Sequence, residues 1–150
     1  MEKTLKITPP EGYEIDKEKS TLDNIVFKKI DDIIIKWNST LMGVEIKDEG
    51  EHFLLNASCP SLYCSWYDAT RYYSGYIRRL PTKKQLKIIA KHIKKINALI
   101  EEGKGYKIES YLWSRESEDD EYAYVVKLIG DNYYPACKYH NNHVRYIIEL

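Results

Sequence analysis

One apolar stripe constrains the fold of this chain more than any other feature of its sequence. The stripe alternates spacings of three and four residues through Leu86, Ile89, Ile93, Ile96 and Ile100. That spacing puts all five side chains on one face of a helix of about four turns. Burial stabilises each such side chain by about 1.5–3 kcal/mol. The sequence therefore predicts one long helix whose stripe packs against a sheet.

Both ends of this predicted helix carry boundary signals. Thr82 and Gln85 form a capping box, in which each side chain accepts a hydrogen bond from the backbone N–H of the other residue. Gly103 and Gly105 follow the last apolar position and end the helix. Lysines occupy much of the remaining surface, at positions 83, 84, 87, 91, 94 and 95. We interpret this lysine-rich side as the solvated back of the helix.

A shorter helix is predicted immediately upstream. Ser65 has the character of an N-cap, with an acidic residue three positions on. Trp66, Ala69 and Tyr73 then share one face, and residues 74–75 (Ser-Gly) end the helix. We expect Trp66 to be part of the scaffold, together with Trp113 farther along the chain.

Strands are predicted on both sides of the two helices. Alternating or β-branched apolar residues mark 24–30, 43–46 and 53–55, whereas periodicity leaves 31–37 unassigned. Beyond the helices they mark 111–113, 122–129, 133–139 and 143–148, with turns at 130–132 and 141–142. Strands, two helices and a closing meander make the fold α+β. The length of 150 residues predicts a single domain, with N-terminal strands and turns in 1–60 and the core in 61–150.

Charge and cysteine content exclude several classes of protein. Twenty-three basic residues balance 23 acidic ones, so the net charge is zero and the field of the whole protein does not attract nucleic acid or a membrane. No segment is apolar enough to span a bilayer, and the first residues lack a secretory signal core. We therefore expect a cytoplasmic protein, with virion association as an alternative. Three cysteines, Cys59, Cys64 and Cys137, predict free and mostly buried thiols.

Five motifs in order, from residue 65 onward, point to a known family. They are Trp66-x-x-Ala69, Arg79-Leu-Pro-Thr82, Tyr111-Leu-Trp-Ser114, an aromatic hairpin around Gly130, and Val144-Arg145. The chain thereby resembles a bacterial and phage branch of the C-type-lectin fold, whose members carry a tryptophan-x-x-alanine helix, RLPT, YWSS, a tyrosine- and asparagine-rich hairpin and a closing VRPV. The resemblance covers about the last 86 residues well and the first third weakly.

Three positions depart from the family pattern. Arg78 replaces the glycine that usually precedes RLPT, Arg115 replaces the second serine of WSS, and Tyr146 replaces the proline of VRPV. The calcium-binding motifs of animal lectins are absent, so a calcium-dependent sugar site is not implied. Only Cys137 lies in the region where the related formylglycine-generating enzymes carry a cysteine pair, so their oxidase chemistry is not implied either.

The resemblance implies a C-type-lectin-like fold with two helices packed on antiparallel sheets and a C-terminal β-hairpin that displays side chains. Some members of this branch are diversified by retroelements in that region. The function implied is non-enzymatic binding of a protein or glycan ligand, without cofactor, metal or membrane. We expect the acidic loop at 115–121 and the hairpin to make the contacts, through Glu118, Asp119, Tyr122, Tyr124, Asn132, Tyr134, Tyr139 and Asn142.

The tyrosines of this set are open to a second interpretation. The chain has 14 tyrosines and only two phenylalanines, and tyrosine suits a contact surface because it combines an apolar ring with a polar tip. Neighbouring residues of a strand point to opposite faces, however, so at most about half of the hairpin tyrosines can share one surface. The others would pack inward or pair across strands.

Other interpretations of the polar clusters remain open. The acidic loop could ligate calcium, but a solvated loop is favoured because no glycine turns the ligands inward. Cys137, His140 and His143 could hold zinc, but spacing of three on a strand separates them, so surface imidazoles are favoured. A nucleic-acid module built on Arg78, Arg79 and the helix lysines is the second functional hypothesis, although no aromatic residue is interleaved with the lysines. A structural subunit of a phage or surface assembly is the third.

Overall fold

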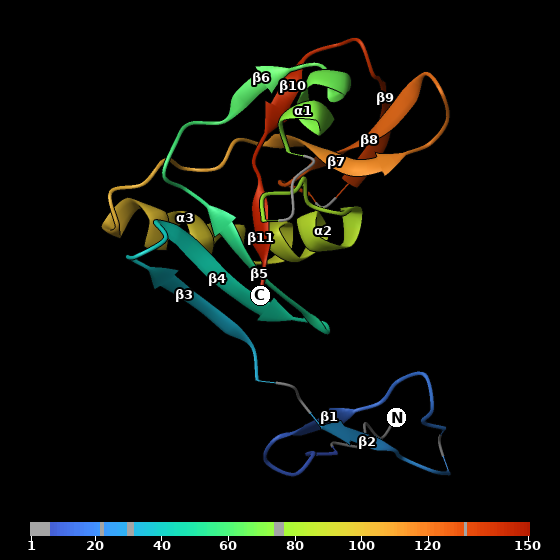
Figure 1. Ribbon diagram of the computed structural model, residues 1–150. Coiled ribbons are helices and arrows are strands. Elements are labelled where there is room, and N and C mark those ends of the chain that lie inside the picture. The colour runs from blue at the N-terminus through green and yellow to red at the C-terminus, as the bar shows by residue number, and fades with distance from the viewer. Residues whose placement is uncertain (1–6, 22, 30–31, 74–76, 131) are drawn as a thin grey trace. The chain divides into compact units, whose positions relative to one another are not determined.

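The computed structural model describes residues 7–21, 23–29, 32–73, 77–130 and 132–150. Contacts divide the chain into two units, residues 1–32 and residues 33–150. The smaller unit contains a two-stranded antiparallel sheet, in which β1 (Tyr13–Ile15) pairs with β2 (Phe27–Lys29) (Figure 1). Strand β2 confirms part of the strand predicted over 24–30; Ile30 lies outside the described residues.

The larger unit begins with an antiparallel sheet of four strands in the order β11-β5-β4-β3. Its strands are β3 (Ile34–Asn38), β4 (Gly43–Asp48), β5 (Glu51–Asn56) and β11 (Ile147–Glu149). Strand β4 was predicted from alternation and β5 from the apolar residues 53–55, and β3 lies in the stretch that periodicity left unassigned. The apolar side chains of this sheet are fully buried at Val44, Ile46, Phe53 and Leu55.

A second sheet has five strands in the order β6-β10-β7-β8-β9. They are β6 (Leu62–Cys64), β7 (Tyr111–Ser117), β8 (Tyr122–Lys127), β9 (Asn132–Cys137) and β10 (Asn142–Val144). All neighbours are antiparallel except β7 and β10, which run parallel. The fold is therefore α+β with mostly antiparallel sheets, as predicted.

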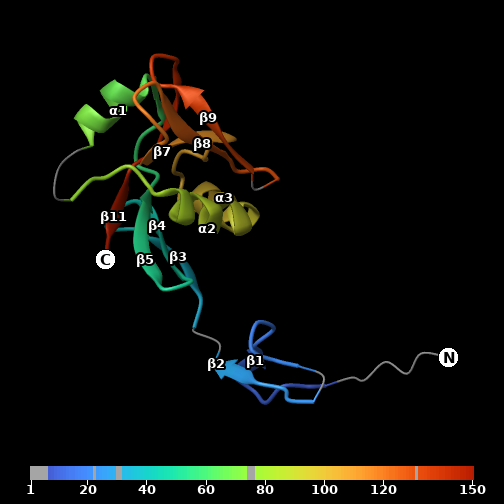
Figure 2. The same cartoon turned by 90° about the vertical axis from the view of Figure 1, so that its right-hand side faces the viewer.

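In the described part of the larger unit, three helices accompany the sheets: α1 (Trp66–Tyr72), α2 (Lys83–Lys91) and α3 (Ile93–Glu102). The predicted Ser65 cap of α1 and the Thr82–Gln85 capping box of α2 are both present. The predicted end of α1 at residues 74–75 lies outside the described residues. Helix α2 packs on β7 and β8, whereas α3 packs on β3 and β4, so the two helices lie between the sheets (Figures 1 and 2).

The prediction of one long helix is wrong, because the chain breaks between α2 and α3 at His92. The backbone of His92 leaves helical geometry there, with φ −113° and ψ 16°. Its imidazole Nε2 lies 2.8 Å from Oδ2 of Asp48 in β4, and Lys91 Nζ lies 3.0 Å from the same oxygen. The apolar stripe continues across the break, since Leu86 and Ile96 on its two sides are fully buried. The expected packing of the stripe is therefore confirmed, but against two sheets rather than one.

A smaller core cluster connects α1 to the five-stranded sheet. It contains Ala69, Leu80 and Trp113, with Trp66 packed against it. The Trp66 indole N–H donates to the carbonyl of Ser114 at 2.9 Å, and the Trp113 indole N–H donates to the carbonyl of Cys64 at 3.0 Å. Both tryptophans thus join two segments of chain, as expected for scaffold residues.

The strand predicted over 143–148 is also wrong as a single element, because the chain changes sheet within it. Strand β10 belongs to the five-stranded sheet and β11 to the four-stranded sheet. Arg145, only 2% exposed, stands at the crossing and donates to the carbonyls of Asn56, Tyr106 and Lys107 at 2.7–3.2 Å. Desolvation by burial lowers the pKa of this guanidinium. The buried arginine therefore satisfies carbonyls of distant segments where the regular ladder stops.

Two predicted loops also have different boundaries. Strand β7 continues to Ser117, so the acidic loop is shorter than 115–121 and begins at Glu118. The turn predicted at 141–142 lies at residues 138–140, and Asn142 already begins β10. None of the helices in the described residues is long and apolar enough to cross a membrane.

Candidate functional site

The strand register divides the predicted contact residues between two faces of the β8–β9 hairpin. Tyr124 lies opposite Pro135 and Val126 lies opposite Tyr133, so Tyr122, Tyr124 and Tyr133 share the face toward α2. Tyr134 lies opposite Val125 and belongs to the other face, as does Asn132. The structure therefore separates the eight predicted contact residues rather than bringing them to one surface.

The face toward α2 joins tyrosine rings to lysine ammonium groups. The rings of Tyr124 and Tyr133 meet edge to face, with centroids 5.7 Å apart and planes at 79°. Lys83 Nζ lies 3.9 Å from the Tyr124 centroid and 4.7 Å from that of Tyr133. Lys87 Nζ lies 4.6 Å from the Tyr133 centroid. Each distance is within the range of a cation–π contact.

These side chains border a hollow of about 310 Å³. Its lining residues are Lys83, Lys84, Lys87, Glu116 and Tyr133, with Tyr124 in contact with Lys83. We call this set the lysine–tyrosine hollow. It combines positive charge, one carboxylate and an exposed aromatic ring, which are the groups that orient a small ligand by charge and by stacking.

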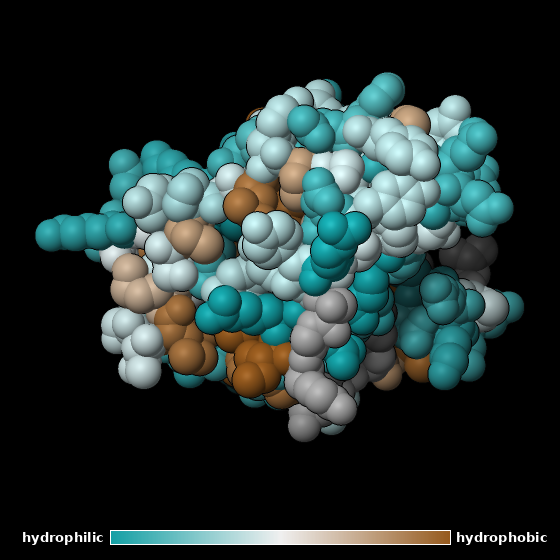
Figure 3. All heavy atoms as spheres, turned by 45° about the horizontal axis from the view of Figure 1, so that its top comes forward, coloured by the Kyte–Doolittle hydropathy of each residue, from teal (hydrophilic) through white to brown (hydrophobic). Residues whose placement is uncertain are grey.

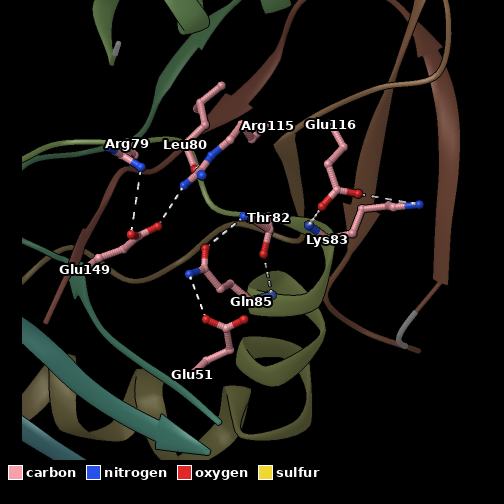
Figure 4. Close-up of polar contacts among 9 residues, drawn as sticks. All are labelled: Glu51, Arg79, Leu80, Thr82, Lys83, Gln85, Arg115, Glu116 and Glu149. Atoms are coloured by element: carbon pink, nitrogen blue, oxygen red, sulfur yellow. Dashed lines mark hydrogen bonds and ion pairs between the residues drawn. The ribbon is translucent and has the colours of Figure 1, made fainter. Parts of the chain in front are cut away.

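The start of α2 holds the lysines of this hollow in place. The Thr82 side chain accepts from the Gln85 N–H at 3.1 Å, and the Gln85 side chain accepts from the Thr82 N–H at 2.9 Å (Figure 4). Glu116 of β7 accepts from the Lys83 N–H at 3.1 Å, and its other oxygen lies 3.7 Å from Lys83 Nζ. The hollow thus stands on a capped helix and a paired strand rather than on loops.

The sequence does not predict this arrangement, because its residues are far apart in the chain. The lysines lie on α2 without an aromatic neighbour in sequence, whereas β8 and β9 bring Tyr124 and Tyr133 beside them. The available signal was the hairpin itself, which alternation and the turn signal at Gly130 predicted. The shared face of Tyr124 and Tyr133 follows from the register, in which Lys127 lies opposite Asn132, whereas a turn at 130–132 would have placed residue 129 opposite residue 133.

The opposite face of the hairpin carries a smaller aromatic pair. The rings of Tyr134 and Tyr111 are 6.4 Å apart and nearly perpendicular, and Lys127 Nζ lies 5.9 Å from the Tyr111 centroid. Burial, followed by the neighbouring Tyr111, raises the pKa of the Tyr134 hydroxyl. Tyr134 is therefore a contact candidate on a different surface from Tyr124.

The acidic loop and Tyr139 form a third group beside α1. Asp119 Oδ1 accepts from the N–H groups of Glu121 and Tyr122, both at 2.8 Å, so this carboxylate shapes its own turn. Glu118 is exposed. Tyr139 is 75% exposed and packs on Tyr67 with 5.1 Å between ring centroids. Burial, followed by Tyr139, raises the pKa of Tyr67.

The cysteines and histidines do not gather into a metal site in the part of the chain that the structure describes. His140 is exposed, whereas His143 is half-buried, with its ring centroid 4.9 Å from that of Tyr63. The last predicted contact residue, Asn142, pairs with Cys64 in the five-stranded sheet. All three cysteines are free, but the expectation that they are mostly buried is wrong, since Cys59 is exposed and Cys64 and Cys137 are half-buried.

The exposed apolar side chains of the described residues are mostly tyrosines. On the face drawn in Figure 3, polar and pale surface predominates and strongly apolar colour is confined to separate patches. A comparison with models of protein families finds no match, and no curated protein matches the chain.

Proposed function

We propose that this chain is a non-enzymatic recognition protein that binds a ligand at the lysine–tyrosine hollow. The supporting observation is the placement of Lys83 and Lys87 over the crossed rings of Tyr124 and Tyr133. The ammonium groups suit an anionic group of the ligand, and the exposed ring of Tyr133 suits a flat apolar face beside it. An acidic sugar of a glycan chain combines these two features.

The proposal includes a C-type-lectin-like scaffold. Two helices between two mostly antiparallel sheets, with the β8–β9 hairpin at one edge, support it. In this proposal the tryptophans and the apolar stripe form the rigid part, and side chains of β8 and β9 vary to suit the ligand. The absence of catalysis is part of the proposal because the hollow offers ammonium groups, one carboxylate and tyrosine, without a nucleophile paired to a base.

Adjacent residues of β9 provide a matched test. Tyr133 and Tyr134 are 46% and 39% exposed and point to opposite faces. We expect Tyr133→Ala to weaken binding of an oligogalacturonate by about tenfold, the scale for a truncated aromatic contact residue, and Tyr134→Ala to leave it unchanged. Isothermal titration with both variants and the wild type measures this. Equal losses in the two variants, or a loss only in Tyr134→Ala, contradict the proposal.

The same tyrosines also support the nucleic-acid hypothesis, because bases stack on aromatic rings that lie beside lysines. Carboxylates nevertheless neutralise much of the basic surface, because Lys83 pairs with Glu116, Lys84 with Glu51 and Lys91 with Asp48. We therefore favour a short ligand over a long polyanion. Single-stranded DNA provides the contrast: binding that falls steeply between about 50 and 200 mM salt would favour the nucleic-acid module instead.

A further inference from the structure

A second hollow, of about 270 Å³, shares no lining residue with the lysine–tyrosine hollow. It is lined by Thr70, Tyr73, Arg79, Leu80 and Arg115. Thr70 belongs to α1, Tyr73 follows that helix, and Arg115 belongs to β7. We call it the arginine hollow. Its residues come from three separate segments, and hydrogen bonds hold the segments that carry the arginines.

The two arginines are positioned by backbone contacts. The N–H of Arg79 donates to the carbonyl of Ile147 at 3.0 Å, and the N–H of Ile147 donates back at 2.8 Å. Arg115 donates from Nε to the Leu80 carbonyl at 3.1 Å and from its backbone N–H to the Pro81 carbonyl at 2.8 Å. The Arg115 side chain is therefore held at Nε, and its Nη2 donates a hydrogen bond to Glu149.

Glu149 of β11 shows which chemistry the arginines accept. One carboxylate oxygen lies 3.1 Å from Arg115 Nη2, and the other lies 3.9 Å from Arg79 Nη1 (Figure 4). Each guanidinium thus meets one oxygen of a single carboxylate. The three side chains are 36–47% exposed, and an ion pair that is exposed to this extent exchanges readily with water and with other anions.

The remaining lining is suited to an apolar body. Leu80 is 2% exposed, and Tyr73 is half-buried and packs its ring 5.0 Å from that of Tyr146. An acid that carries an aromatic or aliphatic body could place its carboxylate on the arginines and its apolar part against Leu80 and Tyr73. Inorganic phosphate would make the first contact but not the second.

We propose that the arginine hollow binds small carboxylic acids with an apolar body, whose carboxylate takes the position of Glu149 between Arg79 and Arg115. This site is independent of the function proposed for the lysine–tyrosine hollow, since the two share no lining residue. Glu149 acts as an internal competitor for the arginines, so its removal strengthens binding.

Titration of the full chain with benzoate, followed by ¹H–¹⁵N NMR shifts, tests this inference. We expect saturable shifts of the Leu80 and Thr70 amides in the wild type. Glu149→Gln binds about two- to fivefold more tightly, because the competing ion pair is an exposed one. Arg79→Gln binds roughly tenfold more weakly, because a charge-assisted hydrogen bond is lost. Lys94→Gln, at an exposed position of α3, is the control for the loss of one positive charge and leaves binding unchanged.

Several outcomes would overturn the proposal. One is that benzoate causes no saturable NMR shifts in Glu149→Gln. Another is that benzoate shifts only the amides of Lys83 and Lys87. The third is that inorganic phosphate binds as tightly as benzoate. The Arg79 side chain contacts Glu149 at the surface, so thermal unfolding is expected to show that Arg79→Gln stays folded. Should that variant unfold, the comparison of Glu149→Gln with the wild type decides the question alone.

Discussion

Helix α2 meets charged side chains at both of its ends, and the two groups differ in how far water reaches them. At its last turn, the carboxylate of Asp48 is 7% exposed and lies against Lys91 and His92. At its first turn, Lys83 and Glu116 are 26% and 40% exposed and border the lysine–tyrosine hollow. One helix can therefore carry a buried charged group that fixes its geometry at one end and a more exposed charged group that remains available to a ligand at the other end.

Removing the buried carboxylate is expected to have the largest effect on this comparison. Asp48→Ala should lower the free energy of unfolding by about 2–3 kcal/mol, because hydrogen bonds to a buried charged group are lost. Urea denaturation measures the change. Glu51→Gln, a partly exposed partner of Lys84 near the first turn, is the matched variant and should cost under about 1 kcal/mol. Equal losses would show that exposure does not distinguish the two ends.

Acid should affect the same end of the helix. Desolvation alone would raise the pKa of Asp48, but hydrogen bonds from His92 and Lys91 outweigh it and lower the pKa below its ordinary value. The folded chain therefore binds this proton less readily than the unfolded chain. The corresponding stability is present above the unfolded pKa of about 3.9 and is lost as the pH falls through the lower folded value.

Denaturation curves between about pH 2 and pH 6 would measure this dependence. Asp48→Asn should flatten the acid limb of the stability profile relative to the wild type. An unchanged slope in Asp48→Asn would contradict the assignment. The effect is smaller than the whole loss in Asp48→Ala, because protonation keeps the side chain and part of its hydrogen bonding.

Lys83→Gln should have a modest effect on stability. It removes a partly exposed ion pair with Glu116 and a cation–π contact with Tyr124, and these together should contribute about 1 kcal/mol. Thermal unfolding of Lys83→Gln, of Tyr124→Leu and of the double variant would separate the two contacts. A loss above about 2 kcal/mol would place Lys83 among the residues that hold the fold.

Lys87→Gln should have the smallest effect on stability, within about 0.5 kcal/mol. The contact that this change removes is the one between the Lys87 ammonium group and the exposed ring of Tyr133. Its effect on ligand binding should be larger than its effect on stability. Titration with oligogalacturonate is expected to show about threefold weaker binding, whereas Lys94→Gln binds like the wild type. Unchanged binding in Lys87→Gln would restrict the site to Lys83 and the tyrosines.

The sequence predicted the elements of the fold whose signals are local. The capping box at Thr82, the cap at Ser65 and the alternation of β4 and β8 all depend on neighbours within a few residues. At the break, His92 contacts Asp48, which is 44 positions away in the chain. The same spacings of three and four fit a continuous helix and a broken one, so periodicity could not reveal it.

The candidate site was predictable only in part for the same reason. The hairpin and its tyrosines were predicted, but the expectation that at most about half of them share a face was too low, because Tyr122, Tyr124 and Tyr133 lie together and only Tyr134 of β9 lies on the other face. Which face of the hairpin meets α2 depends on how β7 and β8 pack together on that helix, and the local sequence pattern does not predict this. The split of the last strand likewise depends on carbonyls from residues 56, 106 and 107, which only the folded chain brings to Arg145.

The pairing of β6 with β10 has a consequence for how the chain reaches its native state. Strand β6 has β10 as its sheet neighbour, and the two are separated in sequence by α1, α2, α3 and three strands. Contacts of such long range slow folding, because a large loop must close before they form. During synthesis, Leu62–Cys64 stays unpaired until its partner strand, Asn142–Val144, has left the ribosome. An unpaired strand edge of this kind is prone to aggregation until its partner strand arrives.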